Sequence, residues 1–196
     1  MSKKLYTIPK IEEIRKISDI TPKYMYPQAI PHACVAEGAL SDETCDAIIE
    51  EMNKLDPYGF HGCEATTREC TQPLHRCLSP ITEFLLQSNS AFWRFELDEK
   101  NPAAWFQTYE AGEGYQVHRD GELGQQRKLT TVALLSSENQ YEGGYLRLIP
   151  YPEYHTLPRT RGTMVTFPSW MLHDVTRVSN GVRQTINLGM FGPAFR

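Results

Sequence analysis

Three side chains that can bind a metal occur in the second half of the chain. His118 and Asp120 are separated by a single residue, and His173 follows much later in the sequence. Two imidazoles and one carboxylate are the ligand set of non-haem Fe(II) sites that leave coordination positions open for oxygen chemistry. Side chains at i and i+2 of a strand share a face, so His118 and Asp120 can reach one metal, which His173 would approach from a distant strand. The alternative is that they are ordinary strand residues, because a spacing as short as H-x-D also occurs by chance.

Arg183 lies ten residues after His173, inside the alternating segment SNGVRQTINLG. A long cation in such a strand either extends its charge to solvent or binds an acid, because a buried charge without a partner is costly. A carboxylate would satisfy it through paired hydrogen bonds. The four residues together suggest a metal site whose co-substrate carries a carboxylate at its far end. The other histidines have no such context, and we expect structural or surface roles for His32, His61, His75 and His155.

Composition indicates a globular protein with one domain, residues 1–196. The chain has 196 residues, of which 40% are hydrophobic and 22% charged, enough to bury a sizeable core. Its net charge of −4 provides no basic surface, which makes nucleic acid an unlikely partner. The lysines near the N-terminus are not followed by an apolar stretch, and no apolar run is long enough to span a bilayer. The odd number of cysteines predicts free thiols in a reducing cytoplasm, and these are Cys34, Cys45, Cys63, Cys70 and Cys77.

The first part of the chain is expected to surround the core. Residues 1–40 contain several prolines and are predicted to form an extended arm that covers a sheet edge or packs on the domain. Residues 41–91 are predicted to be a helical flank. Its first helix, 41–55, has apolar residues at helical spacing and Ser41 available as a cap. A second helix ends near Ser88, with Pro73 or Pro80 in its first turn.

Residues 92–196 have the pattern of a β-rich core. Short segments rich in β-branched and aromatic residues alternate with turn signals, which favours a sandwich or barrel with the helices packed outside it. The fold class is therefore mainly β with flanking α-helices. The expected strands are FWRFEL, AAWFQTY, YQVHRD, LTTVALL, YLRLIP, GTMVTFP, HDVTRV and RQTINLGMF.

With these residues in view, the chain resembles the Fe(II)/2-oxoglutarate-dependent dioxygenases, and within them the prolyl 4-hydroxylase-like group. The resemblance covers about residues 92–196. It implies a double-stranded β-helix, a distorted jelly roll with the iron between its two sheets. Four segments carry it in the same order, namely YEAGEGYQVHRDG, RKLTTVALLSSENQYEGGYLRL, GTMVTFPSWMLHDVTRVSNGVRQTINLG and GPAFR.

The resemblance also implies roles for single residues. His118, Asp120 and His173 match the iron ligands. Arg183 matches the residue that pairs with the C5 carboxylate of 2-oxoglutarate, and Tyr109 matches an aromatic residue that lines the co-substrate pocket. An aspartate at position 120 argues against the halogenating variants, which lack this ligand.

Two positions depart from the family pattern. Leu134 stands where some prolyl hydroxylases have a tyrosine that hydrogen-bonds the C5 carboxylate, so Thr130 or Thr166 is expected to supply that bond. Gly189 stands where several relatives have a tryptophan. The pair Gly143-Gly144, in contrast, matches a paired glycine before a core strand, where backbone passes closely.

The implied activity is hydroxylation of an unactivated C–H bond, with Fe(II), 2-oxoglutarate and O2 as cofactor and co-substrates, ascorbate as an accessory reductant, and succinate and CO2 as co-products. A peptidyl residue, by analogy a prolyl residue, is the first expectation for the substrate. The alternatives are a small metabolite, a free amino acid or a nucleobase, or a non-catalytic binding module on the same scaffold.

The loop-like segment 57–77 is the expected lid of the site, with Arg68 and His61 as residues that could contact substrate. The same segment could in principle bind zinc through Cys63, Cys70, His75 and Cys77. That reading is disfavoured because it lacks the closely spaced cysteine pairs of zinc sites.

Overall fold

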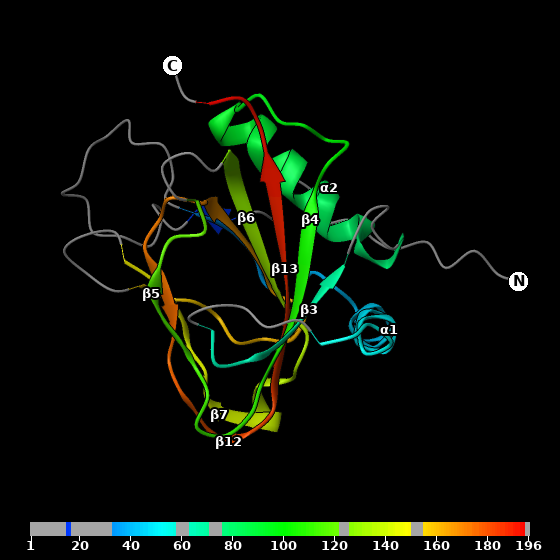
Figure 1. Ribbon diagram of the computed structural model, residues 1–196, viewed down its shortest axis with the longest axis vertical. Coiled ribbons are helices and arrows are strands. Elements are labelled where there is room, and N and C mark those ends of the chain that lie inside the picture. The colour runs from blue at the N-terminus through cyan, green and yellow to red at the C-terminus, as the bar shows by residue number, and fades with distance from the viewer. Residues whose placement is uncertain are drawn as a thin grey trace, which may run out of the picture.

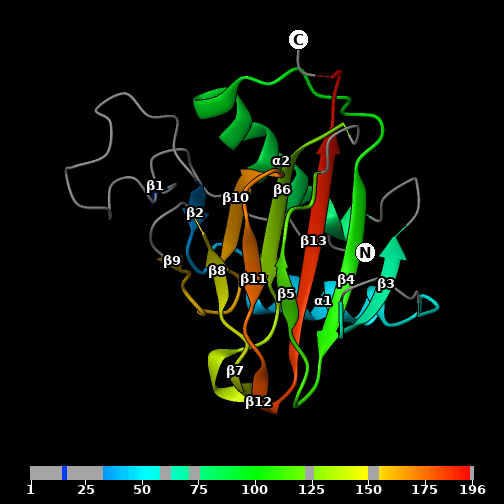
Figure 2. The same ribbon diagram turned by 60° about the vertical axis from the view of Figure 1, so that its left-hand side comes forward.

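Two antiparallel β-sheets face each other and enclose the centre of the molecule (Figures 1 and 2). The computed structural model describes residues 15–16, 33–57, 63–70, 76–121, 126–149 and 155–194. Within these residues, the main sheet has seven strands. In spatial order they are β1 (Arg15–Lys16), β2 (Cys34–Ala36), β10 (Met164–Pro168), β6 (Arg127–Leu134), β13 (Arg183–Phe191), β4 (Ala103–Tyr109) and β3 (Thr66–Cys70).

The second sheet is smaller and lies in front of the main sheet in Figure 2. Its strands, in spatial order, are β5 (Tyr115–His118), β11 (His173–Val175), β8 (Leu146–Leu148) and β9 (His155–Thr156). A separate ribbon of β7 (Tyr141–Gly143) and β12 (Val178–Gly181) closes one end. The predicted strand HDVTRV is therefore divided between β11 and β12. The predicted β-sandwich is confirmed.

Two helices cover the outer face of the main sheet. Helix α1 (Asp42–Met52) begins at Ser41, whose Oγ accepts a hydrogen bond from the Thr44 backbone N–H at 3.3 Å. Helix α2 (Ser79–Ser88) has Pro80 in its first turn, where a missing N–H has no cost. Their apolar faces pack on the main sheet in one buried cluster, which includes Ile48, Phe84, Phe106, Ile186 and Leu188.

The main sheet separates this cluster from a second one between the two sheets. Strand β13 shows the division, because successive side chains point to opposite faces. Ile186, Leu188 and Met190 belong to the helix-side cluster, whereas Arg183, Thr185 and Asn187 line a cavity on the other side. The second cluster includes Tyr109, Leu148, Val165, Phe167 and Val175. This alternation directs polar side chains of a central strand into the space between the sheets.

The predicted strand at Phe92–Leu97 is not formed. A π-helical turn, Asn89–Trp93, extends α2 instead, and Arg94 ends it in the left-handed conformation. The Asn89 side chain then holds the chain from both sides, since its Nδ2 donates to the Phe95 carbonyl and its Oδ1 accepts from the Phe95 N–H, each at 2.9 Å. The apolar residues of this segment pack against the helix-side cluster. These residues have a high β-propensity, but they are packed against the core without forming a strand.

The N-terminal arm and the 57–77 segment contribute edge strands to the main sheet. Residues 15–16 pair with β2, in agreement with an arm that covers a sheet edge; most of the rest of the arm lies outside the described residues. Thr66–Cys70, predicted as loop, pairs with β4 as β3, and the Arg68 Nε donates to the Leu55 carbonyl at 3.1 Å. His61 lies outside the described residues. The strand forms because β4 offers an unpaired edge, which a local pattern cannot reveal.

None of the five cysteines forms a disulfide. Cys70 and Cys77 belong to the helix-side cluster, whereas Cys63 packs on the cluster between the sheets, so the main sheet separates them and they do not make a common zinc site. No helix among the described residues is long and apolar enough to cross a membrane.

Burial should make two of the thiols unreactive. It raises the pKa of Cys45 to about 11 and that of Cys77 to about 12. At pH 8 we therefore expect at most about one thiol in a thousand to be a thiolate, and alkylation by iodoacetamide to be correspondingly slow in the native protein. Peptide mapping by mass spectrometry measures this, with the partly exposed Cys63 as internal reference. Rapid labelling of Cys45 before unfolding would contradict the packing of α1.

Candidate functional site

The three predicted metal ligands come together at one end of the space between the sheets. His118 ends β5 and is the register partner of His173, the first residue of β11. Asp120 follows β5 in a turn that is tied to the β10–β11 connection, because the N–H groups of Asp120 and Gly121 both donate to the Ser169 carbonyl at 2.9 Å. One ligand atom from each of the three side chains lies within 4.8 Å of the others, an arrangement that a single metal ion can bridge.

Hydrogen bonds orient both imidazole rings. Nδ1 of His118 is 2.7 Å from the Gln116 carbonyl oxygen, and Nδ1 of His173 is 2.9 Å from that of Met171. A carbonyl oxygen only accepts, so each Nδ1 carries a proton and Nε2 is the atom left for a metal. Both Nε2 atoms face Asp120 Oδ1, at 3.3 Å for His118 and 3.6 Å for His173. The Tyr115 ring stacks on His118 with its centroid 3.7 Å away and limits rotation of that ligand.

The buried carboxylate and imidazole influence each other's charge. Burial alone would raise the pKa of Asp120, but His173, the hydrogen bonds from both histidines and Arg127 hold it well below its usual range. Burial alone would lower the pKa of His173, but the Asp120 carboxylate raises it above its usual value. The Asp120 carboxylate therefore stays charged and favours a proton on His173, or a cation in place of that proton.

Thr130 and Thr166, the two predicted partners of the C5 carboxylate, do not line the cavity beside Arg183. Thr130 donates to Asp120 Oδ2 at 2.7 Å, so its hydroxyl is used to hold a candidate metal ligand. Thr166 lies between Val165 and Phe167, which face the other sheet, so its own side chain points toward the helices. There its hydroxyl pairs with that of Thr131 at 2.7 Å. Thr166 is therefore excluded by the direction of its side chain, and Thr130 by the bond that its hydroxyl makes to Asp120.

Arg127 is a site residue that the sequence did not reveal. Its Nη1 is 3.4 Å from Asp120 Oδ2, and its guanidinium carbon lies 4.1 Å from the centroid of the Trp105 ring. Strict alternation from Thr130 would point residue 127 toward the helices. A register shift between β13 and β6 pairs Phe191 with Arg127 after Met190 has paired with Leu129, and this bulge turns Arg127 to the site face.

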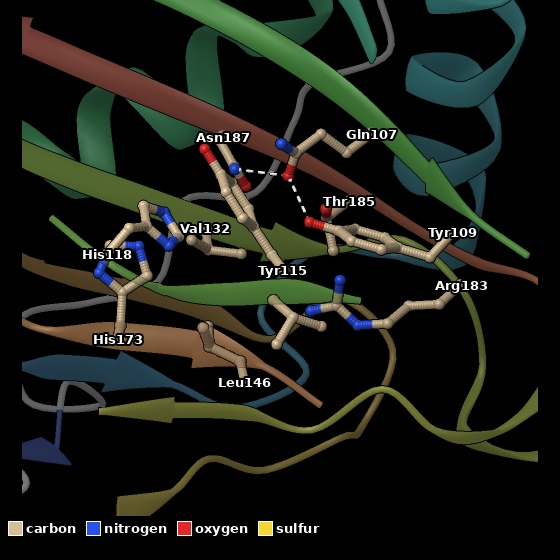
Figure 3. A pocket seen from close by; sticks show the side chains of 11 residues that line it. Gln107, Tyr109, Tyr115, His118, Val132, Leu146, His173, Arg183, Thr185 and Asn187 are labelled. Atoms are coloured by element: carbon tan, nitrogen blue, oxygen red, sulfur yellow. Dashed lines mark hydrogen bonds between the residues drawn. The ribbon is translucent and has the colours of Figure 1, made fainter. Parts of the chain in front are cut away.

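A cavity extends from the histidines to Arg183, with His118 and His173 at one end and the guanidinium at the other (Figure 3). Arg183 is 1% exposed, and none of its three guanidinium nitrogens has a hydrogen-bond partner among the described residues. Its guanidinium carbon lies 5.1 Å from the centroid of the Tyr109 ring. A buried, unpaired cation of this kind is costly in the absence of an anionic ligand.

The predicted close approach at the glycine pair is confirmed. A Cβ on Gly144 would lie 2.7 Å from Arg183 Cδ, and one on Gly143 would lie 2.2 Å from the Arg177 carbonyl oxygen. Both glycines have positive φ angles, of 71° and 59° in chain order. The pair thus leaves room for the stem of Arg183 against the backbone.

A polar wall connects the two ends of the cavity. Gln107 Oε1 accepts from the Tyr109 hydroxyl at 2.9 Å and from Asn187 Nδ2 at 2.8 Å, as Figure 3 shows. Thr185 lines the cavity beside Arg183, and its buried hydroxyl has no partner in the described segments of the chain. It is paired with Leu134 across the sheet, so it stands next to the position where the expected tyrosine is missing. Thr185 and Asn187 are polar residues at i+2 and i+4 from Arg183 on the same strand. This spacing was the sequence signal that could have placed them beside Arg183 in the cavity.

The donor set and the cavity fit a metal ion together with an acidic co-substrate. Two neutral nitrogens and one carboxylate oxygen suit Fe(II) and leave positions open. At the far end, three unpaired guanidinium nitrogens and one unpaired hydroxyl suit a carboxylate.

Comparison with known proteins finds similarity over part of the chain. Residues 104–189 match the model of the 2OG-Fe(II) oxygenase superfamily. A PKHD-type hydroxylase from Klebsiella pneumoniae subsp. pneumoniae is 30% identical over 119 residues, which cover 57% of this chain and 53% of that protein. The chain thus spans about half the length of the curated relatives it matches. The resemblance drawn from the sequence is confirmed, and Fe(II), 2-oxoglutarate and O2 are the cofactor and co-substrates that the superfamily implies.

Solved structures share the fold. A prolyl 4-hydroxylase from Pseudomonas putida has a TM-score of 0.69 at 16% identity, with 83% of this chain and 94% of that chain covered. A prolyl hydroxylase from Trichoplax adhaerens, solved with a peptide fragment of the hypoxia inducible factor oxygen degradation domain, has a TM-score of 0.64 at 14% identity, covering 82% and 83%. The double-stranded β-helix is therefore confirmed as the fold of this chain.

Proposed function

We propose that the protein is a hydroxylase that uses Fe(II), 2-oxoglutarate and O2, with a peptidyl residue, prolyl by analogy, as its substrate. One observation carries the proposal. A His–Asp–His cluster and a buried guanidinium, which has no partner within the part of the chain that the structure describes, lie at opposite ends of a single cavity. A ligand that chelates a metal at one end and carries a carboxylate at the other would satisfy both.

His118, Asp120 and His173 would hold the iron, and Arg183 with Thr185 would bind the C5 carboxylate of 2-oxoglutarate. A bound iron would supply the chemistry that links oxidative decarboxylation of 2-oxoglutarate, with succinate and CO2 as co-products, to hydroxylation of a C–H bond. The chain's own residues orient the co-substrate and exclude water. The Tyr109 ring, Val132 and Leu146 provide the apolar walls of the cavity, where ionic contacts are stronger than in water. Ascorbate as accessory reductant remains a prediction.

The substrate class is proposed from the relatives. Their names describe hydroxylases, and the structure from Trichoplax adhaerens was solved with a peptide. A peptidyl substrate needs an accessible metal end, and His118 at that end is partly exposed whereas Arg183 is enclosed. Succinate formation with proline-containing peptides, compared with free amino acids, tests this part of the proposal. Turnover with free amino acids alone would replace it by a metabolite hydroxylase.

The experiment that tests the chemistry is an anaerobic titration of the purified protein with Fe(II) and then 2-oxoglutarate. We expect the visible charge-transfer band of a metal-chelated keto acid in the wild type and its loss in His173→Ala. A well-folded wild-type protein that never gives the band would rule out a working iron site and leave a binding module as the function.

A further inference from the structure

The two carboxylate oxygens of Asp120 have different partners. Oδ1 faces Nε2 of His118 and of His173, at 3.3 and 3.6 Å. Oδ2 points the other way, accepts the Thr130 hydroxyl at 2.7 Å and forms an ion pair with Arg127 Nη1 at 3.4 Å. Only Oδ1 is therefore directed at the point where the three candidate ligands converge.

The hydroxyl that binds Oδ2 is itself fixed by a buried neighbour. The Thr130 and Ser169 hydroxyls are 3.0 Å apart, and both residues are fully buried. Because the single Thr130 hydrogen is donated to Asp120, Ser169 must be the donor to Thr130. The Ser169 carbonyl also accepts the Asp120 N–H. Ser169 thus holds the backbone of Asp120 directly and its carboxylate through Thr130. Hydrogen bonds that form such a chain strengthen one another.

Arg127 is confined on the other side of the same oxygen. Its side chain is 9% exposed and lies between the Trp105 ring and the backbone at Gly189. A Cβ on Gly189 would approach Arg127 Nε to 2.7 Å, so the missing side chain at this position is what makes room for the guanidinium. The bulge turns the Arg127 side chain toward the site, and Gly189 leaves the space that this side chain occupies.

We propose that Thr130 and Arg127 are positioning residues that restrict Asp120 to binding metal through Oδ1 alone. A carboxylate can bind a cation through one oxygen or through both. Two donors on Oδ2, one of them charged, oppose the rotation that would bring this oxygen to the metal. The restriction keeps a third position open, which a bidentate co-substrate and O2 together require. The inference rests on the proposed metal site.

Counting the water molecules on bound Mn(II) tests the proposal without any turnover. Mn(II) replaces Fe(II) in such sites, and water-proton relaxation reports its exchangeable waters. With three protein ligand atoms and six-fold coordination, the wild type should retain three waters. Thr130→Val, which removes the hydroxyl at nearly constant volume, should retain fewer, approaching two. Thr130→Ser should restore the wild-type count.

Thr131→Val is the matched control. Thr131 is the next residue of β6, is equally buried and loses a hydroxyl bond to Thr166 of the same length, but faces the helices. We expect three waters in this variant. An equal loss of waters in both valine variants, or no loss in a folded Thr130→Val protein, would overturn the proposal.

Gly189→Ala perturbs the second donor independently, because the new methyl group displaces Arg127 and leaves Thr130 in place. It should also lower the water count, and it decides the question if Thr130→Val does not fold. An unchanged count would overturn the role of Arg127 and, if Thr130→Val does not fold, the proposal as a whole. Failure of the wild type to bind Mn(II) would instead refute the proposed metal site, so the two failures are distinguishable.

Discussion

Replacing Asp120 by alanine is expected to abolish both metal binding and 2-oxoglutarate turnover. Asp120 is the only anionic group of the cluster, and both histidine Nε2 atoms face its Oδ1. Loss of residues that merely orient metal ligands weakens metal affinity by about 10- to 100-fold, so loss of a ligand should exceed that range. Removal of the carboxylate also leaves Arg127 buried beside two imidazoles with no compensating charge.

Isothermal titration with Co(II) or Mn(II) and a succinate-release assay measure the two effects separately. Asp98→Ala, which removes a carboxylate bonded only to its own turn, is the control and should behave as wild type in both assays. His173→Ala should reproduce the loss. Turnover retained by Asp120→Ala would refute the metal assignment of the cluster.

Replacing Arg183 by methionine is expected to weaken 2-oxoglutarate binding and, unusually for a buried position, to spare the ligand-free protein. Methionine keeps an apolar stem of similar length against Gly144 and removes a guanidinium that has no partner among the residues described in the structure. Substituting a buried charge by a well-packed apolar group is often neutral or stabilising. Truncating one partner of a buried charge pair costs about 2 kcal/mol or more in binding, which is roughly 30-fold or more in affinity.

Thermal unfolding with and without co-substrate shows both effects in one experiment. The Tm of metal-loaded Arg183→Met without 2-oxoglutarate should be at least that of the wild type, and the upward shift in Tm on adding 2-oxoglutarate should be largely lost. Thr185→Val is the graded comparison, since a single neutral hydrogen bond contributes about 1 kcal/mol and its loss should weaken binding only a few-fold. An unchanged shift in Arg183→Met would show that the carboxylate binds elsewhere.

The candidate metal ligands, the buried guanidinium and the fold class were predictable from the sequence because each depends on local regularity. His118 and Asp120 are separated by one residue, so their side chains stay close although Asp120 lies in the turn after β5. The alternation of β13 directs Arg183 into the space between the sheets. Helix α1 has its cap and its apolar spacing within one short segment. The glycine pair was predictable because only glycine tolerates so close an approach of backbone.

Tertiary structure alone decided which polar residues surround these groups. A β-bulge interrupts the alternation of side chains between the two faces of a strand. Strict alternation would point Arg127 toward the helices, but the bulge opposite Phe191 turns it toward Asp120. Thr130 and Thr166 are both threonines on core strands, and only the direction of each side chain shows that the first holds a ligand and the second faces the helices. Pairing of strands joins residues that are distant in sequence. The formation of β3 and the confined position of Arg127 depend on such distant partners, so a short stretch of sequence does not reveal them.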